Sequence, residues 1–152
     1  MSVGFGRRVA ILALPLVGLA DAVRAEVPAE FRQILDAYAK ALDGNDVETL
    51  VGLFSPNGVF MPEGMPAAAG HDALRATYRS IFSTMKVGLR FDLLDGEQAG
   101  DLGWVRAASA GKTRLLSTGA ESTGTFHLLI VFRREGGAWK IRNYLYASSK
   151  AN

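Results

Sequence analysis

Apolar residues recur every three or four positions in three stretches of the first half of the chain. They occupy residues 26–42, residues 47–54 and, after a loop rich in Pro, Gly and Ala, residues 71–84. This spacing places them on one face of an α-helix. Gly44 follows the first stretch, and Asp46 can accept from free N–H groups at the start of the second. The pattern predicts three N-terminal helices.

From residue 85 onward the period changes to two, which is typical of half-buried strands. Val87, Leu89, Phe91 and Leu93 alternate with polar residues or glycine. Turn residues then separate further apolar stretches. Strands are predicted near residues 59–61, 87–93, 102–110, 123–134 and 138–147, with turns at residues 55–58, 95–96, 111–112 and 136–137. Helices followed by a meander predict a single α+β domain, in which three helices pack on a curved antiparallel sheet.

Residues 1–25 resemble a secretory signal peptide rather than part of the domain. Arg7 and Arg8 precede an apolar run over residues 9–20, and Ala25 ends a small-residue cleavage motif. A membrane anchor or a core helix would be the alternatives, but the run is too short to cross a bilayer core of about 30 Å. We expect cleavage between Ala25 and Glu26, a domain over residues 26–152, export to the periplasm or medium, and no stable membrane insertion.

Charge and composition narrow the expected partners and chemistry. The chain has 17 Lys and Arg against 15 Asp and Glu, and loss of Arg7, Arg8, Arg24 and Asp21 leaves 14 of each. A neutral domain without a basic run gives no reason to expect nucleic-acid binding. The chain has no cysteine, which excludes thiol chemistry, and its two histidines lack metal-ligand spacing. We expect no metal and no cofactor.

Several short motifs together resemble the SnoaL-like and ketosteroid-isomerase-like branch of the nuclear-transport-factor-2-like superfamily. They are Tyr38-x7-Asp46, the run from Leu53 to Phe60, the segment from Pro66 to Gly70, and the ending from Phe132 to Ile141. The resemblance covers residues 26 to about 148. It implies a cone-shaped fold with a pocket between helices and sheet, and a homodimer, since dimers are common among such proteins.

The resemblance also implies positions for site residues. Tyr38 corresponds to the tyrosine that donates to an oxyanion, and His127 to a protonated acid on a long strand. The general base should follow the first strand, where this chain has Met61 and Pro62, and neither can take a proton. Glu63 is the nearest carboxylate. Each candidate has a simpler interpretation: Tyr38 as a core aromatic, His127 as a structural histidine, and Glu63 as a solvated loop residue.

The main hypothesis is that the cone binds a small, mainly apolar molecule, with Tyr38 and His127 as its polar points. If the protein is an enzyme, proton transfer next to a carbonyl is the expected class, with Glu63 or His127 moving the proton. The expected pocket wall is mainly apolar and consists of Phe54, Phe60, Met61, Phe82, Trp104, Leu129 and Asn143.

The alternative hypothesis is a non-catalytic association module that pairs through the outer face of the sheet. Lys140, Arg142, Tyr144 and Tyr146 alternate along the last strand and would present a basic, aromatic surface. A cone filled by its own side chains would favour association. An open cone faced by both Tyr38 and His127 would favour a ligand or an enzyme.

Because the motif ending at Ala25 has small residues at the required positions, the exported protein should begin at Glu26. N-terminal sequencing of protein recovered from the periplasm or medium tests this. A sequence starting at Met1 or Ser2 would refute cleavage.

Overall fold

The structure, a computed structural model, describes residues 26–149; the predicted signal peptide lies outside the described residues. The described part contains three helices and six strands. In chain order these are α1 (Ala29–Asp43), α2 (Val47–Gly52), β1 (Phe54–Met61), β2 (Ala68–Ala69), α3 (His71–Thr84), β3 (Met85–Ala99), β4 (Leu102–Leu115), β5 (Glu121–Glu135) and β6 (Ala138–Ser148).

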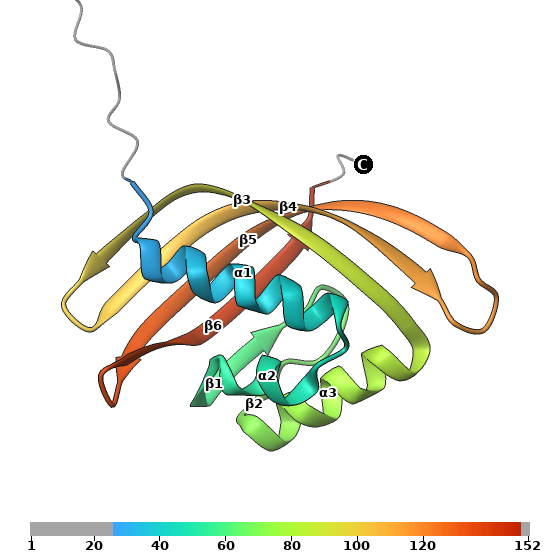
Figure 1. The fold of residues 1–152 in the computed structure, drawn as a ribbon, viewed down its shortest axis with the longest axis horizontal. Coiled ribbons are helices and arrows are strands. Elements are labelled where there is room, and N and C mark those ends of the chain that lie inside the picture. Colours follow the sequence, from blue (N-terminus) through green and yellow to red (C-terminus); the bar gives the residue numbers. More distant parts are fainter. Residues whose placement is uncertain (1–25, 150–152) are drawn as a thin grey trace, which may run out of the picture.

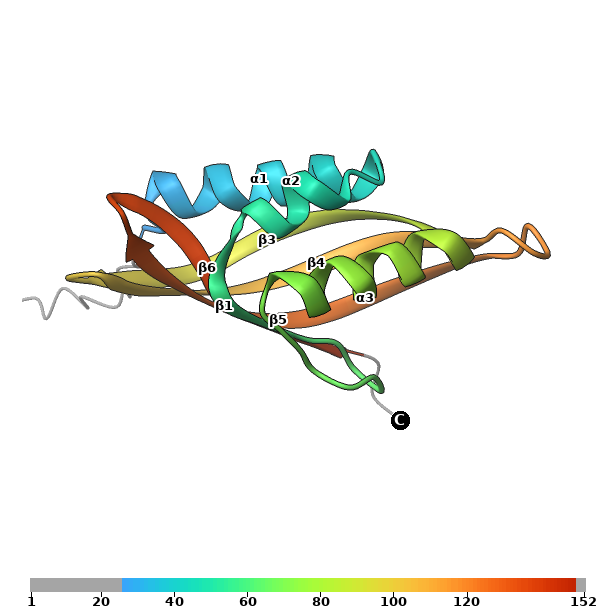
Figure 2. The same cartoon turned by 90° about the horizontal axis from the view of Figure 1, so that it is seen from below.

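All six strands form one sheet in the order β2-β1-β6-β5-β4-β3. Neighbouring strands are antiparallel except β1 and β6, which run parallel. The sheet arches over the helices, and the β4–β5 hairpin extends beyond them at one end (Figure 1). Seen from below, α1 lies beside β3, and α3 contacts β1 and β2 (Figure 2). This arrangement confirms the predicted α+β fold with N-terminal helices on a curved sheet.

The apolar face of α1 covers one end of the inner sheet surface. Phe31 stacks on Phe132 of β5 at 4.2 Å between ring centroids and meets Trp139 of β6 edge-on at 5.0 Å. Gly103 of β4 lies beneath the Phe31 ring, and a Cβ there would collide with it. The missing side chain therefore lets an aromatic residue approach the strand backbone.

Three predicted turns lie inside strands. Residues 95–96 belong to β3, where Leu94 is an extra residue opposite β4, and residues 111–112 belong to β4. Gly111 is paired with Leu89 and Gly124 within the sheet, and the Leu89 side chain occupies the place that a Cβ at Gly111 would take. Residues 55–58 form an irregular part of β1, where the pairing with β6 shifts. The short strand β2 and the parallel β1–β6 pairing were not predicted.

A β-bulge in β6 decides which side chains face the helices. Phe132 pairs with Ile141 but Val131 pairs with Asn143, so Arg142 has no counterpart on β5. An extra residue reverses the alternation of faces on one side of the bulge. Consequently Trp139 and Ile141 face inward before the bulge, and Tyr144 faces inward after it.

Candidate functional site

Three tyrosines from three elements meet at the centre of the cone. Tyr38 of α1 and Tyr78 of α3 share a hydrogen bond of 2.8 Å between their hydroxyl oxygens. Tyr144 of β6 stacks on Tyr38 with ring centroids 4.9 Å apart and an angle of 18° between the rings. All three side chains are buried. Tyr38 thus lies on the apolar face of α1, as predicted. Its hydroxyl is hydrogen-bonded to the Tyr78 hydroxyl of α3.

Burial sets the charge state of this tyrosine cluster, which we define as Tyr38, Tyr78 and Tyr144. Removal from water disfavours the phenolate, so burial raises the pKa of each of the three hydroxyls well above the ordinary value of 10.0. For Tyr38, hydrogen bonding with Tyr78 and Tyr144 lowers the pKa but offsets the effect of burial only in part. The cluster therefore stays neutral near neutral pH and can donate or accept hydrogen bonds without acting as a base.

Aromatic rings fill the cone around the tyrosine cluster. Phe60 stacks on Tyr78 at 5.3 Å, and Phe91 meets Tyr38 edge-on at 6.0 Å. Phe54 and Phe60, both predicted to line a pocket, are 1% and 3% exposed and belong to the core. In this deep part of the domain the cone is filled by its own side chains, which is the condition that was expected to favour the association module.

The predicted inward placement of three residues on β4 and β5 is wrong. His127, Leu129 and Trp104 are exposed, whereas the alternate residues Leu128 and Ile130 are buried against the helices. Successive side chains of a strand point to opposite faces of the sheet, so the exposed residues lie on the outer face. His127 cannot act together with Tyr38 because the sheet separates them.

Asn143 and Met61 also differ from the prediction. Asn143 pairs with Val131, and Met61 pairs with Leu145, which is 44% exposed, so both lie toward the outer face. The prediction assumed unbroken alternation from Trp139 onward, which the bulge at Arg142 interrupts. The sequence carries one sign of the bulge. Trp139 and Ile141 are two positions apart, as in a regular strand, whereas Ile141 and Tyr144 are three positions apart.

The same bulge corrects the surface predicted for association. Tyr144 is 1% exposed and Tyr146 packs against the core, so neither forms an outer aromatic surface with Arg142. The Lys140 ammonium donates to the carbonyl of Gly52 and the Arg142 guanidinium to that of Asn57, so both side chains reach toward the segment around β1.

Glu63 lies at the rim of the cone rather than inside it. It is exposed in the loop between β1 and β2, and its Oε2 accepts a hydrogen bond of 2.7 Å from the backbone N–H of Ser148. Tyr146 is on β6, as is Ser148. Burial is the main cause that raises the pKa of Tyr146, and the charge of Glu63 is the second. Pro62 is buried at the position where the resemblance implies the base. Glu63 is thus the carboxylate that follows the expected base position directly in the sequence, and Tyr146 lies near it.

A set of residues that the sequence reasoning missed forms an apolar wall next to the tyrosine cluster. These side chains pack on the core but remain partly exposed, and the wall consists of Ile81, Phe82, Val87, Leu89, Phe91, Phe126 and Tyr146. Of them, only Phe82 was predicted to line a pocket, and it stacks on Tyr78. We call this set the inner wall.

Ser109 of β4 lies at the centre of the inner wall. It pairs with Phe91 on one side and Phe126 on the other, so the three side chains share the inner face. Its side chain is buried, yet Oγ has no hydrogen-bond partner among the described residues. Leaving a buried hydroxyl unpaired costs free energy, so such a group needs a specific explanation. A lone serine between alanines gave no signal in the sequence.

Within residues 26–149, no His, Cys, Asp and Glu side chains gather in a group of three or more that could hold a metal ion. The three helices of that part are also too short or too polar to cross a membrane.

Comparison with known proteins identifies related folds. The profile of the SnoaL-like domain family matches residues 31–147. A ketosteroid isomerase-like protein from Erwinia carotovora atroseptica SCRI1043 is 26% identical, with a TM-score of 0.75 over 81% of this chain and 96% of that chain.

Two further structures share the fold at lower identity. A nuclear-transport-factor-2-like superfamily protein from Salmonella enterica serovar Typhimurium is 17% identical, with a TM-score of 0.74 over 82% of this chain and 92% of that one. A protein with a cystatin-like fold from Novosphingobium aromaticivorans is 20% identical, with a TM-score of 0.68 over 82% of each chain. No curated protein sequence matches this chain.

The raised pKa values of the tyrosine cluster predict a loss of stability in alkali. Unfolded tyrosines ionise above pH 10, whereas the buried ones stay protonated, so stability present below that pH falls as pH rises further. Each such tyrosine should lower the free energy of unfolding by up to about 1.4 kcal/mol per pH unit. Denaturant titrations at a series of pH values measure this slope.

Tyr38→Phe is the control, because it keeps the ring and removes one titrating group. Its slope above pH 10 should be smaller than that of the wild type. Identical slopes in the two proteins would show that Tyr38 does not stay protonated in the folded state.

Proposed function

Because the chain belongs to the SnoaL-like domain family, we propose that it is an exported protein that binds a small, mainly apolar molecule against the inner wall. The unpartnered Ser109 hydroxyl carries the proposal, because it is a buried donor at the centre of an apolar surface. Ligand sites commonly combine apolar walls with a few placed polar groups. The ketosteroid isomerase-like protein from Erwinia has the same fold, which supports the proposal that this chain binds a small molecule.

The ligand would lie across Phe91 and Phe126 and would move these rings away from the buried Ser109 hydroxyl, which would then donate to a carbonyl or hydroxyl oxygen of the ligand. Those two residues flank Ser109 on adjacent strands, about 5 Å away on either side. Phe82 of α3 belongs to the same wall and would cover the ligand from the helix side. Tyr146, which is partly exposed and lies near Glu63, would contact the end of the ligand at the rim.

The proposed function is binding rather than isomerisation. Pro62 cannot take a proton, the Tyr38 hydroxyl is bonded to Tyr78, and His127 is on the outer face. A positioned base usually contributes about 10²–10⁴-fold to proton transfer. Glu63 is the nearest carboxylate, and its hydrogen bond to the Ser148 backbone directs one oxygen to the strand end.

Binding can be measured with 2-acetylnaphthalene, an apolar aromatic ketone whose fluorescence reports its surroundings. Ser109→Ala should weaken its binding by roughly three- to tenfold, the equivalent of one hydrogen bond. Phe126→Ala should weaken it at least as much by removing wall area. Glu63→Gln should leave the affinity unchanged.

His127→Ala is the matched control, because His127 adjoins Phe126 but points to the outer face and should not affect binding. Equal losses for His127→Ala and Phe126→Ala would refute the site. So would a wild-type protein that neither binds the ketone nor carries a co-purified small molecule detectable by mass spectrometry.

Association through the outer sheet face is the second candidate function. Trp104, Leu129 and Leu145 are 36%, 45% and 44% exposed on three adjacent strands. Leu129 pairs directly with Leu145, and Trp104 pairs with Val131 on the same face. An exposed apolar patch of this kind marks many protein interfaces. We propose that a second copy of the chain covers this patch, which would leave the inner wall accessible.

Leu129→Asp should convert such a dimer into a monomer, because it places a charge in the apolar patch. Sedimentation equilibrium measures the change. Leu116→Asp is the control, since Leu116 is 50% exposed near the tip of the β4–β5 hairpin, away from the patch. A wild-type monomer at high concentration, or equal effects of both variants, would contradict this role.

A further inference from the structure

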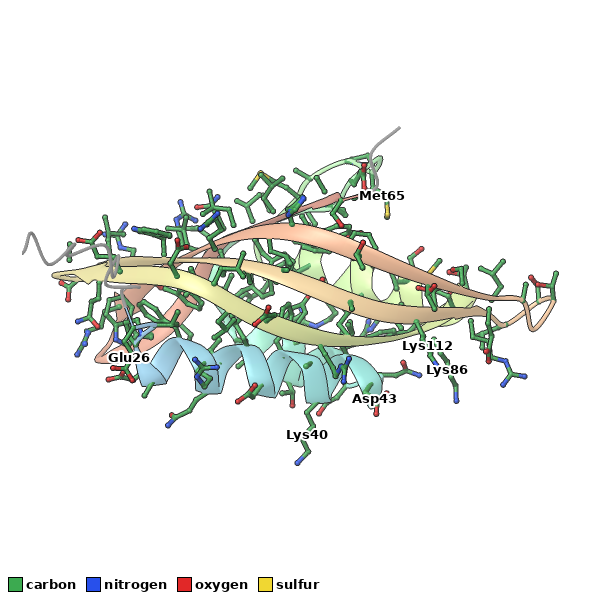
Figure 3. The ribbon with its side chains drawn as sticks, turned by 90° about the horizontal axis from the view of Figure 1, so that it is seen from above. Glu26, Lys40, Asp43, Met65, Lys86 and Lys112 are labelled. Atoms are coloured by element: carbon green, nitrogen blue, oxygen red, sulfur yellow. The ribbon has the colours of Figure 1, made fainter. Side chains whose placement is uncertain are left out.

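A broad groove separates the C-terminal end of α1 from the projecting part of β3, β4 and β5. Its volume is about 1210 Å³. Its charged lining, which we call the basic groove, consists of Lys40, Asp43, Lys86, Arg90, Lys112 and Arg114, with Glu121 at the far end. Figure 3 shows Lys86 and Lys112 close together at the end of α1 that carries Asp43.

Small residues leave space in the floor of the basic groove. Gly88 of β3 and Ala110 of β4 line it on the sheet face that also carries Lys112. A Cβ added at Gly88 would point to the Asp43 carboxylate, which lies 3.5 Å away, so this strand surface faces the helix end. The longer side chains on either side of these residues then form the walls.

Five cationic side chains against two acidic ones give the basic groove an excess of positive charge. None of the five makes an ion pair with a described residue. Lys86 is directly opposite Arg114 in the β3–β4 ladder, and Arg114 is directly opposite Glu121 in the β4–β5 ladder. Glu121 offsets part of the charge of Arg114, but the row still carries two cations against one carboxylate. An anion bound beside Lys86 and Lys112 would relieve the remaining repulsion.

We propose that the basic groove binds a small soluble molecule through a phosphate or pyrophosphate group. Arg90 can pair with two phosphate oxygens at once, and Lys86 and Lys112 supply compact charges beside it. Thr123 of β5, directly opposite Lys112, adds a hydroxyl to the lining. The acidic Asp43 and Glu121 limit the cationic surface at both ends, which favours a compact anion over an extended polyanion.

The groove shares Val87 and Leu89 with the inner wall, but its cationic side chains are separate from the Ser109 site. Lys112 and Arg114 are on the face of β4 opposite to Ser109, since exposed and buried residues alternate along that strand. Binding in the groove would therefore persist in Ser109→Ala, and failure of either proposal leaves the other standing.

Titration calorimetry of the full chain with inorganic pyrophosphate tests the proposal. The wild type should bind at about millimolar concentration or more tightly, and added sodium chloride should weaken binding. The double variant Lys86→Gln/Lys112→Gln should lose roughly tenfold or more in affinity, since each lysine contributes a charge-assisted contact.

Arg32→Gln/Arg133→Gln is the matched control, because it removes the same charge from exposed positions outside the groove. It should change the affinity by less than about twofold. Equal losses in the two double variants would overturn the proposal by showing an effect of overall charge. It would also fail if pyrophosphate does not bind, or if the protein binds only to phosphatidic acid vesicles or single-stranded RNA. Thermal unfolding confirms that each variant is folded.

Discussion

The tyrosine cluster is the contact on which the cone depends, because it joins elements that are distant in the sequence. Tyr38, Tyr78 and Tyr144 bring together the first helix, the third helix and the last strand. Phenol rings give large buried areas, and their hydroxyls satisfy one another where water is absent. The same arrangement that holds the helices to the sheet also closes the deep part of the cone. The apolar ligand proposed for the cone would therefore have to lie on the partly exposed inner wall beside it.

The bulge at Arg142 is the second constraint, because it brings Tyr144 to the cluster. Without the extra residue, Asn143 would face the core, and a polar amide would occupy the centre of the cone. The outer face gains from the same shift, since Leu145 then joins Leu129 in the exposed apolar patch. One irregular residue thus determines the chemistry of both faces of the last strand.

The sequence was informative where local spacing determines structure. The helix over residues 71–84 was predicted with its observed bounds. The family and the fold were predicted from short motifs that occur in the expected order along the chain. Spacing was not enough for the faces of long strands. His127 was placed inward through the resemblance and Asn143 through regular alternation along the last strand. Neither argument reveals a bulge or a pairing register. Ser109 and the basic groove depend on side chains from several strands, which only the assembled sheet brings together.

The position of β6 between β1 and β5 affects the order in which the chain can fold. β1 can join β5, β4 and β3 only through β6, because β6 lies between β1 and β5 in the sheet and follows both in the sequence. Until residues 138–148 are available, the first helices and β1 have no complete surface to bury against. Pairings between such distant segments close late and slowly. The growing chain therefore cannot complete this sheet until residues 138–148 have been made.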